Sequence, residues 1–151
     1  MSKFVVRSKV KLKRYPFSRQ ISILYRQELK IVTPLLEPYG ITFSQLPFIM
    51  KLYAKNGISQ DELVSYVNVD KAIGTRVLKQ LEESSLIIRK PNPNDARSKL
   101  VYFTEKALLL EPSLLKVINE WNELLTIGLS EQDLKSLERI NKQIIQNVNQ
   151  K

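Results

Sequence analysis

Apolar residues recur at helical spacing along most of the chain, and the period changes only between residues 86 and 103. These stripes predict helices that begin near residues 16–18, 44, 59, 71, 104 and 130. Residues 86–88 and 100–103 are rich in β-branched and aromatic side chains, so they predict two short strands. The Pro-Asn-Pro-Asn-Asp sequence at 91–95 predicts the turn between them. The pattern therefore predicts a mainly α fold with one small β-hairpin.

Capping residues and helix breakers refine these bounds. Pro34 and Pro112 fall inside apolar stripes, so we expect the first helix to kink or break at Pro34, and Pro112 to interrupt the fifth with a kink near residues 108–111. Gly74 falls inside the helix expected over residues 71–83, where glycine costs about 1 kcal/mol relative to alanine. Residues able to cap or open a helix stand at the expected helix starts, and Ser59 with Glu62 has the spacing of a capping box. These residues are Ser44, Ser59, Asp70 and Thr104, with Ser130 and Asp133 opening the sixth helix.

The helix over residues 71–83 has two chemically different faces. Ile73, Val77 and Leu81 form one apolar stripe. The face opposite the stripe carries the candidate DNA-binding residues Lys71, Ala72, Thr75, Arg76 and Lys79, and the hairpin that follows carries two more, Arg97 and Lys99. A cationic helix followed by a basic hairpin can address two grooves of double-stranded DNA, so we interpret this stretch as a DNA-reading unit. The alternative is a pair of packed helices without a ligand.

Several short motifs resemble a known family. They are Thr75-Arg76, Leu81-Glu82, Leu86-Ile87, Asp95-Ala96-Arg97 and Phe103-Thr104-Glu105-Lys106. Together they are similar to the recognition helix and wing of the MarR family, the dimeric winged helix-turn-helix regulators of bacteria and archaea. Ser85 and Ala107 depart from the pattern, because the family usually has glycine at both positions.

The resemblance to the MarR family implies a fold, a ligand site and roles for individual wing residues. It implies a winged helix-turn-helix with terminal dimerisation helices, and a small-molecule effector bound between those helices and the winged domain. It also implies that Arg97 enters the minor groove and that Asp95 structures the wing by pairing with a nearby arginine. Without the resemblance, Asp95 is an ordinary turn residue. Aromatic residues that could line an effector pocket, or simply fill a core, are Tyr25, Phe43, Phe48, Tyr53 and Trp121.

The terminal helices are apolar over a wide surface, which predicts that they form the seam of a homodimer. The alternative is a core within one chain. We therefore expect residues 1–40 to form a basic arm and a first dimerisation helix, residues 41–103 the winged DNA-binding unit, and residues 104–151 the C-terminal dimerisation helices. The candidate dimerisation residues are Leu24, Trp121, Leu137, Ile140 and Ile144.

Positive charge collects in the first 40 residues and in the expected DNA-reading unit of the 151-residue chain, whose net charge is +9. Residues 1–40 carry nine Lys or Arg against two acids, whereas residues 104–151 carry six against seven. A polyanionic partner explains this gradient better than solubility does. Residues 1–14 are either an arm that touches phosphates or a partner subunit, or a solvated tail.

Composition also excludes several classes of protein. The chain has no cysteine and no histidine, so it has no disulfide, no thiol sensor and neither the usual acid–base switch nor the commonest metal ligand. We expect no cofactor, no metal and no enzyme, because glycine-rich phosphate loops and nucleophile–base pairs are also missing. No apolar run approaches 18 residues and no secretory signal is present, so we expect a cytoplasmic protein without a membrane partner.

The expected function is that of a ligand-responsive repressor that binds a pseudo-palindromic operator as a homodimer. One alternative is a winged-helix module that docks an acidic protein. Another is a global regulator similar to the staphylococcal accessory regulators.

Overall fold

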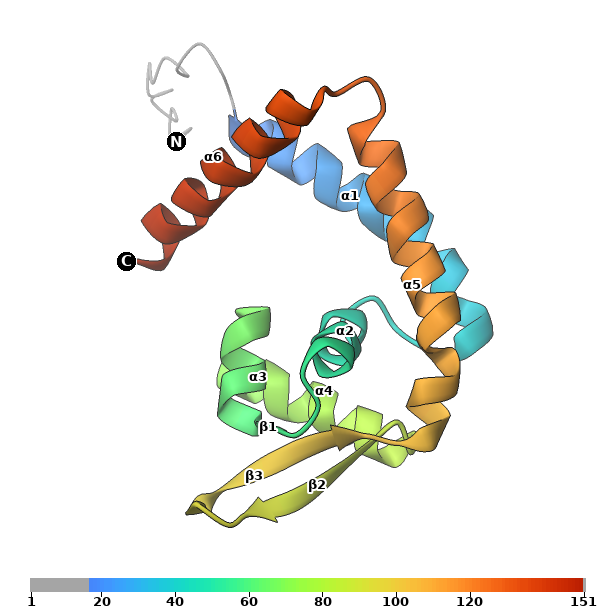
Figure 1. Cartoon of the computed structure of the whole chain (residues 1–151), viewed down its shortest axis with the longest axis vertical. Helices are drawn as coiled ribbons and strands as arrows, with labels where there is room; N and C mark the ends of the chain where they lie inside the picture. Colours follow the sequence, from blue (N-terminus) through green and yellow to red (C-terminus); the bar gives the residue numbers. More distant parts are fainter. Residues whose placement is uncertain (1–16, 151) are drawn as a thin grey trace, which may run out of the picture.

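The computed structural model describes residues 17–150, so the basic arm expected over residues 1–14 lies outside the described part (Figure 1). The expected mainly α fold with a hairpin is confirmed. In chain order the elements are α1 (Phe17–Leu36), the 3-10 helix η1 (Glu37–Tyr39), α2 (Leu46–Ala54), β1 (Ile58–Ser59), α3 (Gln60–Val67), α4 (Lys71–Glu83), β2 (Ile87–Asn92), β3 (Asp95–Phe103), α5 (Glu105–Thr126) and α6 (Glu131–Asn149).

The sheet is antiparallel, with β3 between β1 and β2. Ile87 pairs with Phe103 at the base of the hairpin and Pro91 pairs with Lys99 near its tip, where the register shifts. In β1, Ile58 pairs with Val101. The sequence did not predict β1, because two residues are too few to show an alternating pattern.

The core lies where α1 and α5 meet the winged helix-turn-helix (Figure 1). The second half of α1 packs along α5, and helices α2, α3 and α4 close over the base of the sheet. No residue of α6 is buried. The largest fully buried side chains come from every part of this core: Phe48, Leu36, Ile49, Leu52, Ile58, Leu63, Leu78, Leu81, Leu86, Ile87, Leu114 and Val32.

Most of the expected helix starts are correct, but three of the expected caps differ in the structure. The Ser130–Asp133 capping box is complete, and the Thr104 hydroxyl accepts from the amide of Ala107 at 3.2 Å. Only half of the Ser59 box forms, because the Glu62 carboxylate accepts from Lys55 instead. Asp70 occupies its N-cap position without a side-chain hydrogen bond. The expected Ser44 cap is wrong: α2 begins at Leu46 with Gln45 as its N-cap residue.

Neither proline breaks its helix. Pro34 lies in the last turns of α1, and Pro112 lies inside a continuous α5, so the expected interruption there is wrong. Proline removes one backbone hydrogen bond from a helix. The residues on either side of Pro112 compensate, since Ala107 and Leu114 are fully buried and hold both halves of α5 against the core.

The buried stripe of α4 is shifted from the expected one. Val77 and Leu81 are buried as expected, but Ile73 is 38% exposed and Gly74 is buried in its place. A Cβ atom on Gly74 would lie 2.5 Å and 2.7 Å from the two methyl groups of Val64 on α3. The missing side chain therefore allows α3 and α4 to pack closely in the helix-turn-helix.

This contact reverses the stability change expected at Gly74. Helix propensity favours alanine there, but the clash with Val64 should make Gly74→Ala less stable by about 1–3 kcal/mol. Urea unfolding followed by circular dichroism measures the difference. In a Val64→Ala background, where both methyl groups are gone, the same change should cost much less. A more stable Gly74→Ala protein in the parent background would contradict this packing.

Candidate nucleic-acid interface

The outer face of α4 presents the residues expected to read DNA. Lys71, Ala72, Thr75, Arg76 and Lys79 are all exposed on this one helix. Lys79 lies 3.7 Å from Glu83, but both side chains are more than 60% exposed, so this pair contributes little. The face is therefore open to a partner that brings negative charge.

The wing tip is organised by two side chains that accept hydrogen bonds from the backbone. The Asn92 Oδ1 atom accepts from the amide of Asn94, and the Asp95 Oδ1 atom accepts from the amide of Arg97, each at 3.0 Å. The expected pairing of Asp95 with an arginine side chain is wrong: within residues 17–150 Asp95 forms no ion pair. Asp95 does structure the wing, but as a turn residue.

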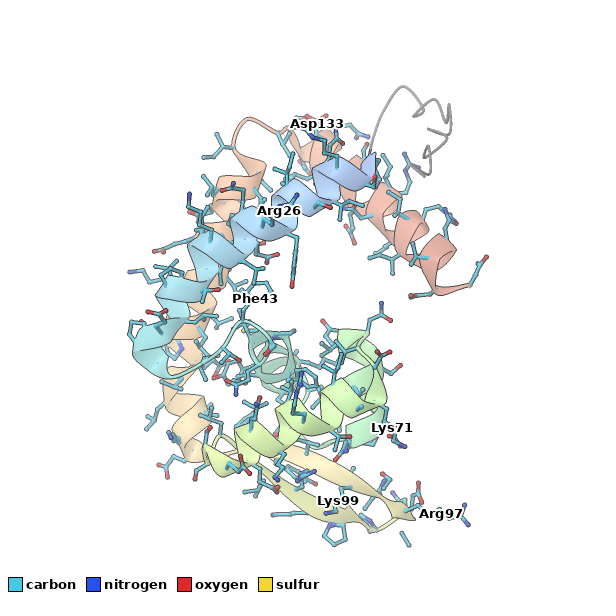
Figure 2. The ribbon with its side chains drawn as sticks, turned by 180° about the vertical axis from the view of Figure 1, so that it is seen from behind. Arg26, Phe43, Lys71, Arg97, Lys99 and Asp133 are labelled. Carbon is cyan, nitrogen blue, oxygen red and sulfur yellow. The ribbon has the colours of Figure 1, made fainter. Side chains whose placement is uncertain are left out.

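A polar groove of about 270 Å³ lies between the start of α4 and the wing. Figure 2 shows Lys71 at the first turn of α4, Arg97 near the tip of the hairpin and Lys99 farther back along β3. Asp61 is the one acidic side chain among the lining residues in the described part of the chain. The groove thus brings Lys71 of the helix together with Arg97 and Lys99 of the wing. Its lining residues are Gln60, Asp61, Lys71, Arg89, Arg97, Ser98 and Lys99.

Arg89 ties the wing to both helices of the helix-turn-helix, and the sequence did not predict this role. Its Nε atom donates to Glu82 Oε2 of α4 at 3.1 Å, Nη2 donates to the same oxygen, and Nη1 donates to Gln60 Oε1 of α3 at 3.3 Å. The hydrogen bond from Arg89 lowers the pKa of Glu82, and the same bond raises the pKa of Arg89. Arg89 is therefore a structural cation, unlike the exposed Arg97 and Lys99.

The end of α4 is fixed to the start of α5. Ser85 has the left-handed φ of +58°, a conformation that favours glycine, the residue usual there in the family. The Thr104 hydroxyl donates to Ser85 O at 2.7 Å, and the Lys106 ammonium donates to Ser84 O at 2.8 Å. The carbonyl oxygen of Ala107, at the other departure from the family pattern, accepts from the Tyr53 hydroxyl. A movement of α5 would therefore be transmitted to α4.

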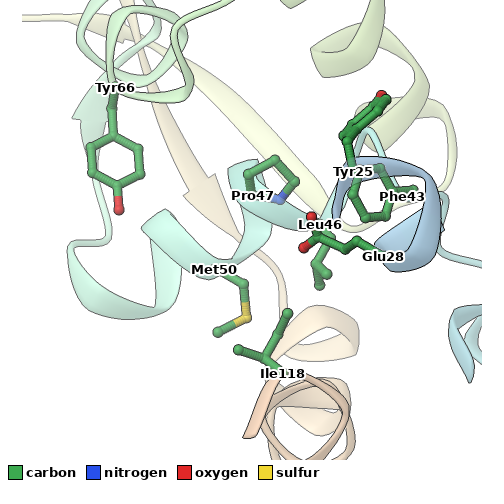
Figure 3. A pocket seen from close by; sticks show the side chains of 8 residues that line it. All are labelled: Tyr25, Glu28, Phe43, Leu46, Pro47, Met50, Tyr66 and Ile118. Carbon is green, nitrogen blue, oxygen red and sulfur yellow. The ribbon is translucent and has the colours of Figure 1, made fainter. Parts of the chain in front are cut away.

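An apolar cavity of about 440 Å³ lies between α1, α2, α3 and α5 (Figure 3). Of the aromatic residues expected to line a pocket, Tyr25 and Phe43 do so. Phe48 and Trp121 are buried in the core, and Tyr53 lies outside the lining. The remaining lining residues were not predicted, because they come from four separate elements: Glu28, Leu46, Pro47, Met50, Tyr66 and Ile118.

Glu28 is the one carboxylate in this lining. Burial raises its pKa, and a hydrogen bond with Trp121 partly offsets that rise. The sequence did not predict that Glu28 lines a cavity. Helical periodicity in α1 identifies the apolar positions and does not show which polar residue faces an apolar cavity.

The expected dimerisation residues differ in how much of each side chain is exposed in the single chain. Leu24 is 54% exposed, Leu137 and Ile140 are each 44% exposed, and Ile144 is half-buried. Trp121 is only 7% exposed within a single chain. It packs in the core of the single chain, so its side chain is not part of the exposed apolar surface.

Within residues 17–150, no helix is long and apolar enough to cross a membrane, and no cluster of acidic, cysteine or histidine residues could hold a metal ion.

Known proteins are similar to this chain in both sequence and fold. The model of the MarR family matches residues 41–99. A MarR transcriptional regulator from Methanosarcina mazei Go1 is 31% identical, with a TM-score of 0.78 over 89% of this chain and 96% of that one. A Listeria monocytogenes structure, described as a MarR family transcriptional regulator complexed with a 26mer DNA, is 26% identical, with a TM-score of 0.81 over 87% of each chain.

A relative from Bacillus subtilis is also similar over most of the chain. Its organic hydroperoxide resistance transcriptional regulator is 28% identical over 83% of this chain and 84% of its own length. With a matching family model, a relative above 30% identity along nearly the whole chain and the same winged helix-turn-helix, this chain belongs to the MarR family of transcriptional regulators.

Proposed function

We propose that the protein is a ligand-responsive repressor that binds a pseudo-palindromic site on double-stranded DNA as a homodimer. The observation that carries the proposal is that Lys71, at the start of the cationic outer face of α4, lines one polar groove together with Arg97 and Lys99 of the wing. The Listeria monocytogenes relative of the same fold, crystallised with DNA, supports it.

In this proposal, helix and wing read different features of the duplex. Arg76 is placed to read a guanine in the major groove through its planar fork, and the methyl groups of Thr75 and Ala72 are placed to meet thymine. Lys71 and Lys79 contact phosphates. Arg97 enters the minor groove and senses its width, with Lys99 on the adjacent backbone.

Dimerisation sets the spacing of the two reading units. Residues 41–103 act as the reader, while α1, α5 and α6 join two copies through exposed apolar side chains such as Leu24, Leu137 and Ile140. Two recognition helices then enter successive major grooves about one helical turn apart.

The apolar cavity provides the route for a ligand to act on DNA binding. It lies between the terminal helices and the winged unit, and α5 is hydrogen-bonded to the end of α4. A small molecule regulates only if it binds one spacing of the two reading units better than the other. An occupant that holds these parts apart would favour the spacing that does not fit the operator.

Selection of bound sites from random duplex DNA tests the function, followed by affinity measurements at several salt concentrations. We expect an inverted repeat bound about a thousandfold or more tighter than a scrambled duplex. Affinity should fall linearly with salt on logarithmic axes, because each neutralised phosphate releases counterions.

Two variants provide the controls. Lys99→Gln should reduce the slope of the salt dependence, whereas Lys135→Gln, on α6 and paired with Glu131, should leave it unchanged. Equal binding to every duplex, or binding only to an acidic protein, would refute the proposal.

A further inference from the structure

We infer that the apolar cavity takes an organic cation: a molecule with an aromatic or aliphatic body and one positive centre that lies against Glu28. This deepens the ligand responsiveness proposed above and rests on it. The inference comes from the walls of the cavity, from its one carboxylate and from the charge of the rest of the chain.

The walls suit a bulky apolar body. The Tyr25 and Phe43 rings meet edge to face, with centroids 6.1 Å apart and an interplanar angle of 74°. Met50 and Ile118 also line the cavity, and a thioether adapts to aromatic ligands of different shape. At about 440 Å³ the cavity is in the range of small-molecule sites. The faces of Tyr25 and Phe43 also attract positive charge.

Glu28 determines the sign of the ligand's charge. It is the one acidic residue in the lining, it is half-buried, and it forms no ion pair within residues 17–150. A carboxylate that is partly removed from water and lacks a cation favours a positively charged ligand and repels an anion. A bound cation would supply the partner that the chain itself does not provide there.

The surrounding charges make this preference easy to recognise. The chain has a net charge of +9, so unspecific attraction favours anions. Lys51 does not line the cavity; its ammonium lies 4.2 Å from the centroid of the Tyr66 ring, which does. An anionic ligand would have to draw Lys51 away from that ring. Selectivity for a cation would therefore have to come from Glu28.

Two probe ions of nearly the same shape and opposite charge test the inference: tetraphenylphosphonium and tetraphenylborate. Isothermal titration calorimetry of the full chain without DNA measures both affinities in sodium buffer. We expect the phosphonium to bind about tenfold or more tightly than the borate, because one ion pair in a partly buried site is worth about that factor. Glu28→Gln should remove this preference.

Control variants separate the carboxylate from its surroundings. Glu37→Gln, at an exposed position in η1 outside the cavity, should leave both affinities unchanged. Lys51→Gln should weaken only the borate. Circular dichroism verifies that each variant is folded. Equal affinities for the two ions, tighter binding of the borate, or a preference that survives Glu28→Gln would each overturn the inference.

The same probes distinguish failure of this inference from failure of the proposed function. Operator binding by the ligand-free protein tests DNA recognition and does not depend on the cavity. We expect the phosphonium to weaken operator binding by the parent protein and to do so much less with Glu28→Gln. Operator binding that responds to the borate alone would leave the regulator intact and refute the cation site.

Discussion

Aspartate at both Leu137 and Ile140 should abolish tight operator binding while the winged helix-turn-helix stays folded. Each side chain is 44% exposed in the single chain, and no residue of α6 is buried, so the substitutions remove no core contact. In the proposed dimer the same positions become buried, where two unpaired carboxylates per protomer are costly. A monomer that meets one half-site should bind about a thousandfold or more weakly.

Sedimentation measures the association state, and a duplex-binding titration measures the affinity. The matched control is Gln132→Asp with Gln146→Asp, which adds the same charge at exposed positions on α6 away from the Leu137 and Ile140 stripe. It should leave dimer and affinity intact. If the Leu137 and Ile140 variant sediments as a dimer with parent-like affinity, α6 is not the seam.

The second large effect is expected at Arg76. Arg76→Ala should cost about 1–3 kcal/mol for each half-site, because the guanidinium has no ion pair within residues 17–150 and is free to form two hydrogen bonds with one guanine. The loss should nearly vanish on an operator whose matching base pair is already changed. A mutant cycle between the residue and that base pair measures the coupling.

Lys79→Ala serves as the matched control, since it removes a cation from the same face of α4. Its effect should be nearly the same on every duplex and should shrink at high salt. An Arg76→Ala protein that weakens all duplexes equally would show that Arg76 contacts phosphate and that sequence is read elsewhere.

Local sequence patterns predicted the elements of the reading unit well. The Thr104 cap, the helix start at Ser130, the hairpin and the exposed face of α4 all depend on residues within a few positions of one another. The family resemblance rests on such short motifs too, and the comparisons confirm it.

Where the predictions from the sequence were wrong or incomplete, contacts between elements distant in the chain are the reason. Ile73 is exposed because α3 packs against α4 at the neighbouring Gly74. Helical periodicity within α4 alone does not predict that contact. Pro112 was expected to interrupt α5, yet the helix is continuous, and Ala107 and Leu114 on either side of the proline are fully buried. The bonds of Arg89 to Glu82 and Gln60 and the place of Glu28 in the cavity likewise require the folded chain.

The attachment of Arg89 has a consequence for exchanging wings between relatives. A grafted hairpin brings its own groove-contacting residues, but Arg89 is also part of β2, and its partners Glu82 and Gln60 belong to the recipient's helices. With only 16% of its side chain exposed, a transplanted arginine without those acceptors would be a poorly solvated, unpaired charge. Residues 60, 82 and 89 therefore form the smallest set that must be inherited together for a chimeric regulator to keep its wing in place.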